Sequence, residues 1–207
     1  MIAAIAGYVD AVAFLQLGGF FVSFMSGNTT RLGVGLAEDR GAAGVAAALI
    51  AAFVSGAVAG SLVSRHARSA RRVAVLGLVS VLLAGAPLLI GCGAAYAGAL
   101  LLAGAMGAVN AAFEEDGDTR FGVTYMTGAL VKIGQRLATA LSGGPRWDWA
   151  PYLLLWAGLA AGAAVGAAAF GRLGANAIWL AALAAAGLTL GAAIEARTQG
   201  VRSHGSR

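Results

Sequence analysis

The sequence predicts an all-α integral membrane protein, a polytopic bundle of helices. Hydrophobic residues make up 59% of the 207-residue chain and charged residues only 11%, and the mean hydropathy is +0.81. So little polar surface cannot cover a water-soluble globule of this length. The apolar runs are long and lack the alternation of barrel strands, so inside a bilayer they must satisfy their backbone groups as helices.

The charge and the cysteine content argue against several classes of protein. A net charge of +5 does not indicate nucleic-acid binding in a membrane chain, because basic residues there mark the cytoplasmic face. The single cysteine, Cys92, provides no disulfide framework and no cluster of metal ligands. We therefore expect the lipid bilayer as a partner, and no nucleic acid, metal or cofactor.

Six apolar runs approach the roughly 20 residues that a membrane span requires. They cover residues 1–21, 42–64, 73–91, 93–113, 151–171 and 175–195. Two further segments, 22–38 and 122–141, are shorter and are interrupted by glycine and by basic residues. We expect these two segments to be broken or re-entrant. If they crossed instead, the chain would have eight spans.

An internal repeat organises these runs. Residues 24–31 and 125–132 each place an aromatic residue and a methionine before a hydroxyl residue and a glycine, with a basic residue four positions after the glycine. Upstream, residues 7–11 match 107–111 at an offset of 100 (107 − 7). Downstream, Gly56 and Gly60 match Gly158 and Gly162 at an offset of 102 (158 − 56).

The repeat predicts how the single membrane domain, 1–207, is divided. Repeat one covers about 1–91 and repeat two about 93–195, followed by a polar C-terminal tail at 196–207. Each repeat holds three spans and one broken segment, so the second repeat enters the membrane from the opposite side. This 3+3 inverted repeat is typical of many secondary transporters. Eight spans would instead make the two repeats parallel.

The distribution of Lys and Arg predicts the orientation. With the broken segments not crossing, Arg31, Arg40 and Arg172 fall on one side and eleven basic residues on the other. The eleven are Arg65, Arg68, Arg71, Arg72, Arg120, Lys132, Arg136, Arg146, Arg197, Arg202 and Arg207. The positive-inside rule then places both termini of this multi-pass protein in the cytoplasm.

Asp10 is the only acidic residue well inside a predicted span. A carboxylate in the membrane is costly, so it should face the bundle or a wet cavity and be a candidate for binding a substrate or an ion. The alternative is a structural carboxylate, hydrogen-bonded to a neighbouring helix. Asn110, its counterpart in the second repeat, keeps the polarity without the charge.

The residues from Ser26 to Thr30 have the composition of a helix start, where glycine permits a break and side-chain oxygens cap the first turn. A half-helix beginning there would direct free N–H groups toward an anion, and Arg31 would strengthen that preference. We expect residues 26–31 to form one polar site with Asp10. The alternative is an interfacial turn whose basic residue reaches lipid phosphates.

Both repeats contribute candidate binding residues. They are Asp10, Ser26, Gly27, Asn28, Thr29 and Arg31 in the first repeat and Asn110, Thr127, Gly128 and Lys132 in the second. Because a broken segment needs close backbone approach, we expect leucine to be damaging at Gly27 and at Gly128.

Enzymatic chemistry finds little support. Phe24 stands where the Gly-x-Ser-Gly motif of an intramembrane serine protease needs its first glycine, and neither His66 nor His204 lies in a predicted span. No buried base is therefore available to activate a nucleophile. The acidic residues at 114–118 lack the spacing of a calcium loop. We expect that the protein is not an enzyme.

Small residues recur at four-residue spacing, in Gly56-x-x-x-Gly60 and in Gly158-x-x-x-Gly162-x-x-x-Gly166. This spacing lets helix backbones approach closely. We expect packing within one bundle, with a homodimer interface as the alternative, since six spans are few for enclosing a two-sided pathway.

The motifs Gly7-Tyr8-Val9-Asp10-Ala11, Ser26-Gly27-Asn28-Thr29 and Tyr125-Met126-Thr127-Gly128 together resemble the YoaK-like family. These are bacterial inner-membrane proteins, catalogued as a domain of unknown function. The resemblance extends from residue 1 to about 195 and implies a six-span protein of the bacterial cytoplasmic membrane. It implies no established substrate.

Two functions are compatible with these features. The inverted repeat, the broken segments and Asp10 favour a small transporter or permease for a small solute, with an anion as the candidate cargo. The competing hypothesis is a non-transporting membrane scaffold or accessory protein, in which Asp10 and the glycine motifs serve only packing.

Overall fold

The computed structural model describes residues 1–67, 70–115, 118–119 and 126–204. Helices form almost all of this part of the chain. In order they are α1 (Ile2–Gln16), α2 (Met25–Glu38), α3 (Arg40–Ala67), α4 (Arg71–Gly91), α5 (Ala95–Ala108), the 3-10 helix η2 (Val109–Phe113), α6 (Met126–Leu141), α7 (Ala150–Leu173), the 3-10 helix η3 (Gly174–Ala177) and α8 (Ile178–His204). The predicted helical class is confirmed.

The strands of the described ranges form one short antiparallel hairpin. It pairs β1 (Glu114–Glu115) with β2 (Asp118–Thr119), between η2 and α6. The acidic residues of the sequence around 114–118 fall partly on this hairpin, and Asp116 lies outside the described residues.

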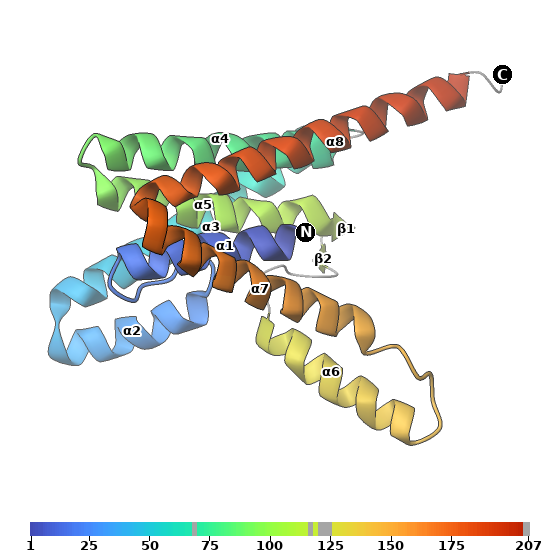
Figure 1. The fold of residues 1–207 in the computed structure, drawn as a ribbon, viewed down its shortest axis with the longest axis horizontal. Helices are drawn as coiled ribbons and strands as arrows, with labels where there is room; N and C mark the ends of the chain where they lie inside the picture. The colour runs from blue at the N-terminus through green and yellow to red at the C-terminus, as the bar shows by residue number, and fades with distance from the viewer. Residues whose placement is uncertain (68–69, 116–117, 120–125, 205–207) are drawn as a thin grey trace.

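Four segments of the described chain are long and apolar enough to cross a membrane, judged by length and composition. They are Arg40–Ala67, Arg71–Gly91, Ala95–Ala112 and Ala150–Thr198. The last segment contains both α7 and α8, and the chain changes direction between them at η3 (Figure 1). With 15 residues, α1 is apolar but shorter than the roughly 20 residues of a typical span. Six spans therefore stay a prediction.

The first predicted run, 1–21, is wrong at its C-terminal end. Helix α1 stops at Gln16, and Gly18 and Gly19 follow with φ angles of 65° and 100°. Such positive angles suit glycine and let the chain reverse. The chain then loops back before α2 leads outward beside α3 (Figure 1). We call residues 17–24 the reversing segment.

Helix α8 continues into the predicted polar tail at 196–207 and ends at His204. Polar residues end a membrane span, but they do not end a helix when no proline or cap interrupts it. Residues 205–207 lie outside the described residues.

The helices of the first part of the chain pack against helices of the second part, and each short helix packs on a long one. Helix α1 lies against α7 and α5 lies against α3, while α2 packs on α3 and α6 packs on α7. In Figure 1, α1 and α5 run in opposite directions, and so do α4 and α8. The core between these helices is apolar, and among its fully buried side chains are Val9, Val12, Leu83, Leu102, Met106 and Ile178.

Glycine brings the backbones of α1 and α7 together. A Cβ atom added at Gly7 would overlap the carbonyl oxygen of Leu159, and one added at Gly162 would overlap that of Ala4. A Cβ at Gly166 would lie 2.5 Å from the Tyr8 carbonyl oxygen. These positions therefore admit only glycine without a shift of backbone.

The interface between α3 and α5 is built in the same way. A Cβ at Gly107 would overlap the carbonyl oxygen of Phe53, and one at Gly56 would overlap that of Gly104. A Cβ at Gly60 would lie 2.7 Å from the carbonyl oxygen of Ala108. The predicted use of Gly56 and Gly60 for packing within the bundle is thus confirmed.

Gly158 departs from the predicted spacing pattern. A Cβ there would meet no atom of the described chain within 4 Å. Glycine at four-residue spacing on α7 therefore faces α1 only at its second and third positions, Gly162 and Gly166.

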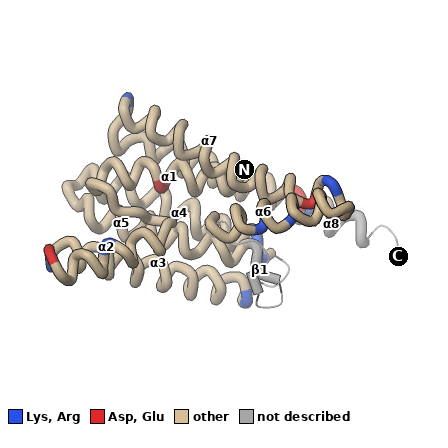
Figure 2. Tube along the Cα trace, turned by 90° about the horizontal axis from the view of Figure 1, so that it is seen from below, with Lys and Arg blue, Asp and Glu red and all other residues tan. Residues whose placement is uncertain are grey.

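Basic residues gather at the end of the bundle toward which α8 extends (Figure 2). The described ones include Arg65 and Arg71 at the α3–α4 turn and Arg197 near the end of α8. Arg40 and Arg172 lie beside the α2–α3 and α7–α8 connections, at the opposite end. Three of the eleven counted residues, Arg68, Arg120 and Arg207, lie outside the described residues. The orientation across a membrane stays a prediction.

Candidate functional site

Asp10 on α1 anchors the reversing segment. Its Oδ1 atom accepts hydrogen bonds from the backbone N–H groups of Val22 and Ser23, each at 2.8 Å. Val22 and Ser23 are buried, so their N–H groups depend on this acceptor in place of water. The carboxylate is therefore tied to the segment that leads into α2.

Asn28 on α2 holds the same segment from the other side. Its side chain is fully buried. The amide Oδ1 accepts a hydrogen bond from the Phe21 N–H at 3.0 Å, and Nδ2 donates to the Phe21 carbonyl at 2.6 Å. The side chain thus satisfies both backbone groups of one residue in a segment without regular structure.

The predicted capping role of the residues from Ser26 to Thr30 is wrong. Helix α2 begins at Met25, and its first turn has no side-chain cap. The Asn28 amide is already engaged by Phe21, and the Thr29 hydroxyl donates backward to the Met25 carbonyl at 2.9 Å. The side chains that could have capped α2 are therefore used elsewhere.

The helix start offers few free N–H groups. The N–H groups of Gly27 and Asn28 point to the Phe24 carbonyl oxygen, at 3.1 and 3.3 Å. The side chains of Ser26 and Thr29 are exposed. A binding role for these residues stays a prediction.

Arg31 stacks on an aromatic ring. Its guanidinium carbon lies 4.7 Å from the centre of the Phe20 ring, a cation–π contact. Among the described residues, Arg31 forms no ion pair with Asp10. The structure thus brings Asp10 and Asn28 to one segment, whereas Ser26, Thr29 and Arg31 lie outside that network.

The second repeat is arranged differently. In η2, Asn110 donates from Nδ2 to the carbonyl oxygens of Met106, at 3.0 Å, and Gly107, at 3.3 Å. Its Oδ1 atom is buried and has no hydrogen-bond partner among the described residues.

The candidates Thr127, Gly128 and Lys132 lie on α6. All three are exposed, and α6 packs on α7 away from the central helices (Figure 1). No hydrogen bond joins Asn110 to the described part of α6. Tyr125, which begins the second motif, lies outside the described residues.

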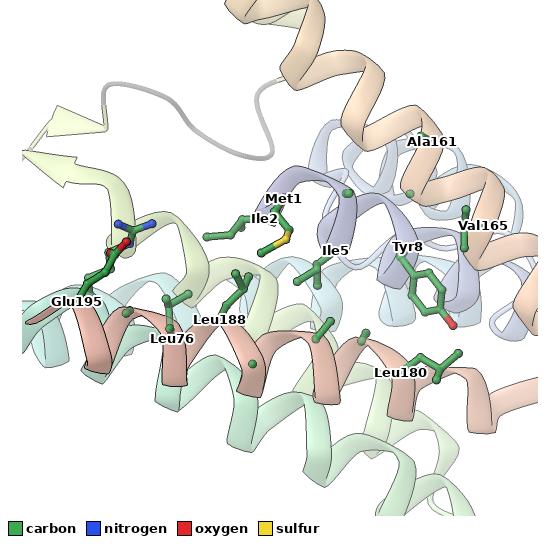
Figure 3. Close-up of a pocket in the computed structure, with 18 residues that line it drawn as sticks. Met1, Ile2, Ile5, Tyr8, Leu76, Ala161, Val165, Leu180, Leu188 and Glu195 are labelled. Atoms are coloured by element: carbon green, nitrogen blue, oxygen red, sulfur yellow. The ribbon is translucent and has the colours of Figure 1, made fainter.

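A large cavity that no sequence motif predicted lies between α1, α7 and α8. Its volume is about 780 Å³, within the range of roughly 300–1,000 Å³ that small-molecule sites occupy. Ile2, Ile5, Val165 and Leu188 are among the side chains that line it (Figure 3).

The polar groups of this cavity are few. Arg72 and Glu195 line it, on α4 and α8. Tyr8 also lines it, and the Tyr8 hydroxyl donates a hydrogen bond to the Ala177 carbonyl at 2.9 Å, next to the η3 turn. The remaining lining is apolar, so the cavity is suited to an apolar group.

A smaller groove lies on another side of α1. It has a volume of about 290 Å³ and is lined by Asp10, Phe14, Phe21 and Leu159 among others. Asp10 therefore borders this groove between α1 and α7 and is absent from the larger cavity.

The long apolar helices and their close, glycine-mediated packing define a helical integral membrane protein. The chain belongs to the family described as "Protein of unknown function (DUF1275)", which matches residues 1–191 and is the YoaK-like family that the motifs indicated. A relative from Rhizobium meliloti (strain 1021), "UPF0700 transmembrane protein RA0705", is 38% identical over 192 residues, which cover 92% of this chain and 83% of the relative. No solved structure resembles the chain at a significant level.

Proposed function

We propose that the chain is a small transporter of the bacterial cytoplasmic membrane, built from two inverted halves that open one at a time. Its solute would occupy the cavity between α1, α7 and α8. The observation that carries this proposal is that the α1–α7 interface matches the α5–α3 interface. The first of these borders an open cavity, whereas side chains fill the corresponding space beside the second.

The interfaces correspond residue by residue. Gly7 faces Leu159, and Gly107 faces Phe53. The residue numbers of the two glycines differ by 100 (107 − 7), and those of their partners differ by 106 (159 − 53). The same two offsets relate the pair of Ala4 and Gly162 to that of Gly104 and Gly56, and the pair of Tyr8 and Gly166 to that of Ala108 and Gly60.

This correspondence supports a repeat in which the halves exchange their first helices. In this repeat Gly56 aligns with Gly162, whereas the sequence-based alignment paired Gly56 with Gly158. The corrected register is one helical turn later. Since α1 and α5 run in opposite directions in Figure 1, the axis relating the halves lies across the bundle, as in inverted-repeat transporters.

The halves differ in how tightly they are closed. In α5, the exposed fraction of Leu102 and of Ala105 is 1% or less. Their counterparts in α1 at an offset of 100, Ile2 and Ile5, are only partly buried and line the cavity. One half is therefore open where the other is packed, which is the asymmetry that alternating access requires.

The opposite end of α1 supports the same proposal. A small gap lined by Ala13, Leu17, Ile90 and Ala99 has no room for a water molecule. A solute in the cavity would therefore find that end sealed. If the basic end of the bundle is cytoplasmic, the cavity opens toward the cytoplasm and both termini lie there.

This proposal includes six spans, with α2 and α6 as the two segments that do not cross. It places the solute pathway within one chain, so it does not depend on a homodimer. It also includes no enzymatic step. Asp10 would act on the pathway by holding the reversing segment beside α1.

Flux into proteoliposomes tests the proposal. A panel of labelled solutes, from small anions and metabolites to amphiphiles with an apolar body, should include one that wild-type protein transports. Ala184→Trp, which fills the cavity from α8, should abolish that flux, whereas Leu183→Trp on the outer face of α8 should not. Asp10→Asn should reduce it. No flux dependent on the cavity or on Asp10 would favour the scaffold.

A further inference from the structure

The shape of the cavity restricts what can fill it. Leu180 and Glu195 both line it and are fifteen residues apart on α8, which corresponds to about 22 Å of helix at 1.5 Å per residue. An extended chain advances about 1.2 Å per bond, so on the order of 18 bonds would cover this length. The cavity is thus long for its volume of about 780 Å³.

The wall along this length is apolar. Ala184 lines it from α8. Leu188 on α8, Ile5 on α1 and Val165 on α7 also line it (Figure 3). The Tyr8 hydroxyl, near the η3 end, already donates to Ala177. A compact hydrophilic solute would leave its polar groups without partners here, at a cost of several kcal/mol per group. The body of the ligand must therefore be apolar.

The charges lie at the other end of the cavity. Arg72 and Glu195 line it there, Arg71 precedes Arg72, and Arg197 lies two residues beyond Glu195. These four residues comprise three positive charges and one negative charge. Their field favours an anionic group at this end.

We propose that the cavity binds a single-chain amphiphile with an anionic head group, of which a long-chain fatty acid is the simplest example. The chain would lie along α8 and the carboxylate would lie beside Arg72. This inference rests on the proposed function for its cavity and names the class of solute. A two-chain phospholipid is the competing occupant, and the test below distinguishes the two.

Binding can be measured without transport. The protein would be placed in nanodiscs of zwitterionic lipid and titrated with palmitate, with hexadecanol and acetate as comparators. We expect saturable binding of palmitate and none of acetate. Ala184→Trp and Val165→Trp, from facing walls, should each abolish palmitate binding, while Leu183→Trp should retain it. Thermal melting would confirm that the variants are folded.

The head group is tested by a matched pair of arginines. Arg72→Gln should weaken palmitate binding about two- to fivefold, the effect of one exposed charge, and leave hexadecanol binding unchanged. Arg71→Gln, at the neighbouring exposed position that does not line the cavity, should weaken palmitate binding less than Arg72→Gln does and should also leave hexadecanol binding unchanged.

Several outcomes would overturn the inference. They are the absence of saturable palmitate binding, binding that the two cavity variants leave intact, and displacement of palmitate by phosphatidylglycerol in the disc at equal mole fraction. Palmitate binding without flux of any solute would refute the transporter and keep the inference. Flux of another solute without palmitate binding would support the transporter and refute the inference.

Discussion

The carboxylate of Asp10 accepts a hydrogen bond from the backbone N–H of Ser23, thirteen residues further along the chain, at 2.8 Å. The residues between them leave α1, reverse at two glycines with positive φ and return to α1. A charged acceptor forms stronger hydrogen bonds to backbone N–H groups than a neutral one does. The acid inside an apolar helix therefore defines the path of the chain into α2.

Replacing Asp10 should release the reversing segment. Asp10→Ala leaves the buried N–H groups of Val22 and Ser23 without an acceptor, so we expect a loss of about 2 kcal/mol or more of stability. Asp10→Asn keeps one carbonyl oxygen and should cost less. Amide hydrogen exchange at Val22 and Ser23 would measure the effect, and unchanged protection in Asp10→Ala would contradict it.

Asn28 should be sensitive to removal of its amide. In Asn28→Ala both backbone groups of Phe21 lose their partner inside a buried site, and we expect a destabilisation of about 1–3 kcal/mol. Thr29→Ala is the control, because it removes one exposed hydroxyl from the same helix. Thermal unfolding in detergent would compare them. Equal melting temperatures would show that the buried amide is dispensable.

Glycine at the α1–α7 contact should not be replaceable. We expect Gly162→Leu to destabilise the fold by about 1–3 kcal/mol or more, because its side chain would collide with the backbone of Ala4. Gly158→Leu, one turn earlier on the same helix, has space and should be nearly neutral. The yield and melting temperature of folded protein would distinguish them, and similar losses at both positions would argue against the interface.

Leucine at Gly128 should also be tolerated, contrary to the sequence-based expectation. A Cβ at Gly128 would meet no atom of the described chain within 4 Å. At Gly27, by contrast, a Cβ would lie 2.5 Å from the Phe24 ring and 2.9 Å from the Phe21 ring. Comparing the folded yields of Gly27→Leu and Gly128→Leu would measure this difference. A severe loss at Gly128 would restore a packing role for that position.

The native cysteine can report the orientation. Cys92 is exposed at the α4–α5 turn, at the opposite end of the bundle from the α3–α4 turn. If the basic end is cytoplasmic, an impermeant maleimide should label Cys92 in intact cells. A cysteine introduced as Ala70→Cys in a Cys92→Ser background should be labelled only after lysis. The opposite pattern would invert the proposed orientation.

Composition and spacing predicted the broad architecture because they depend on local physics. Each of the six apolar runs corresponds to a helix, and the segments at 22–38 and 122–141 contain the two shorter helices α2 and α6. The end of α1 was missed because Leu17, Phe20 and Phe21 are as apolar as the helix before them. Hydropathy records the length of an apolar run, whereas the turn depends on the hydrogen bonds that Asp10 supplies.

The site was harder to predict, because it depends on contacts between distant parts of the chain. In a sequence with 32 glycines, spacing alone does not show which glycines of α7 face α1, whereas the contacts of Gly162 with Ala4 and of Gly166 with Tyr8 do. No pattern in the sequence predicted the cavity, for a similar reason. It arises where α7 and α8 separate around α1, and no property of Ile5 or Leu188 in the sequence reveals that separation.

The packing of α1 against α7 has a consequence during synthesis. Helix α1 ends at Gln16, but its partner α7 is complete only at Leu173. At about 5–20 residues per second, the ribosome needs on the order of ten to thirty seconds to make the intervening chain. During that time the surface of α1 around Gly7 lacks the helix that it packs against in the folded chain. A nascent chain that stalls before α7 emerges would therefore leave the Gly7 face of α1 without its partner, and would be a natural target for proteolysis.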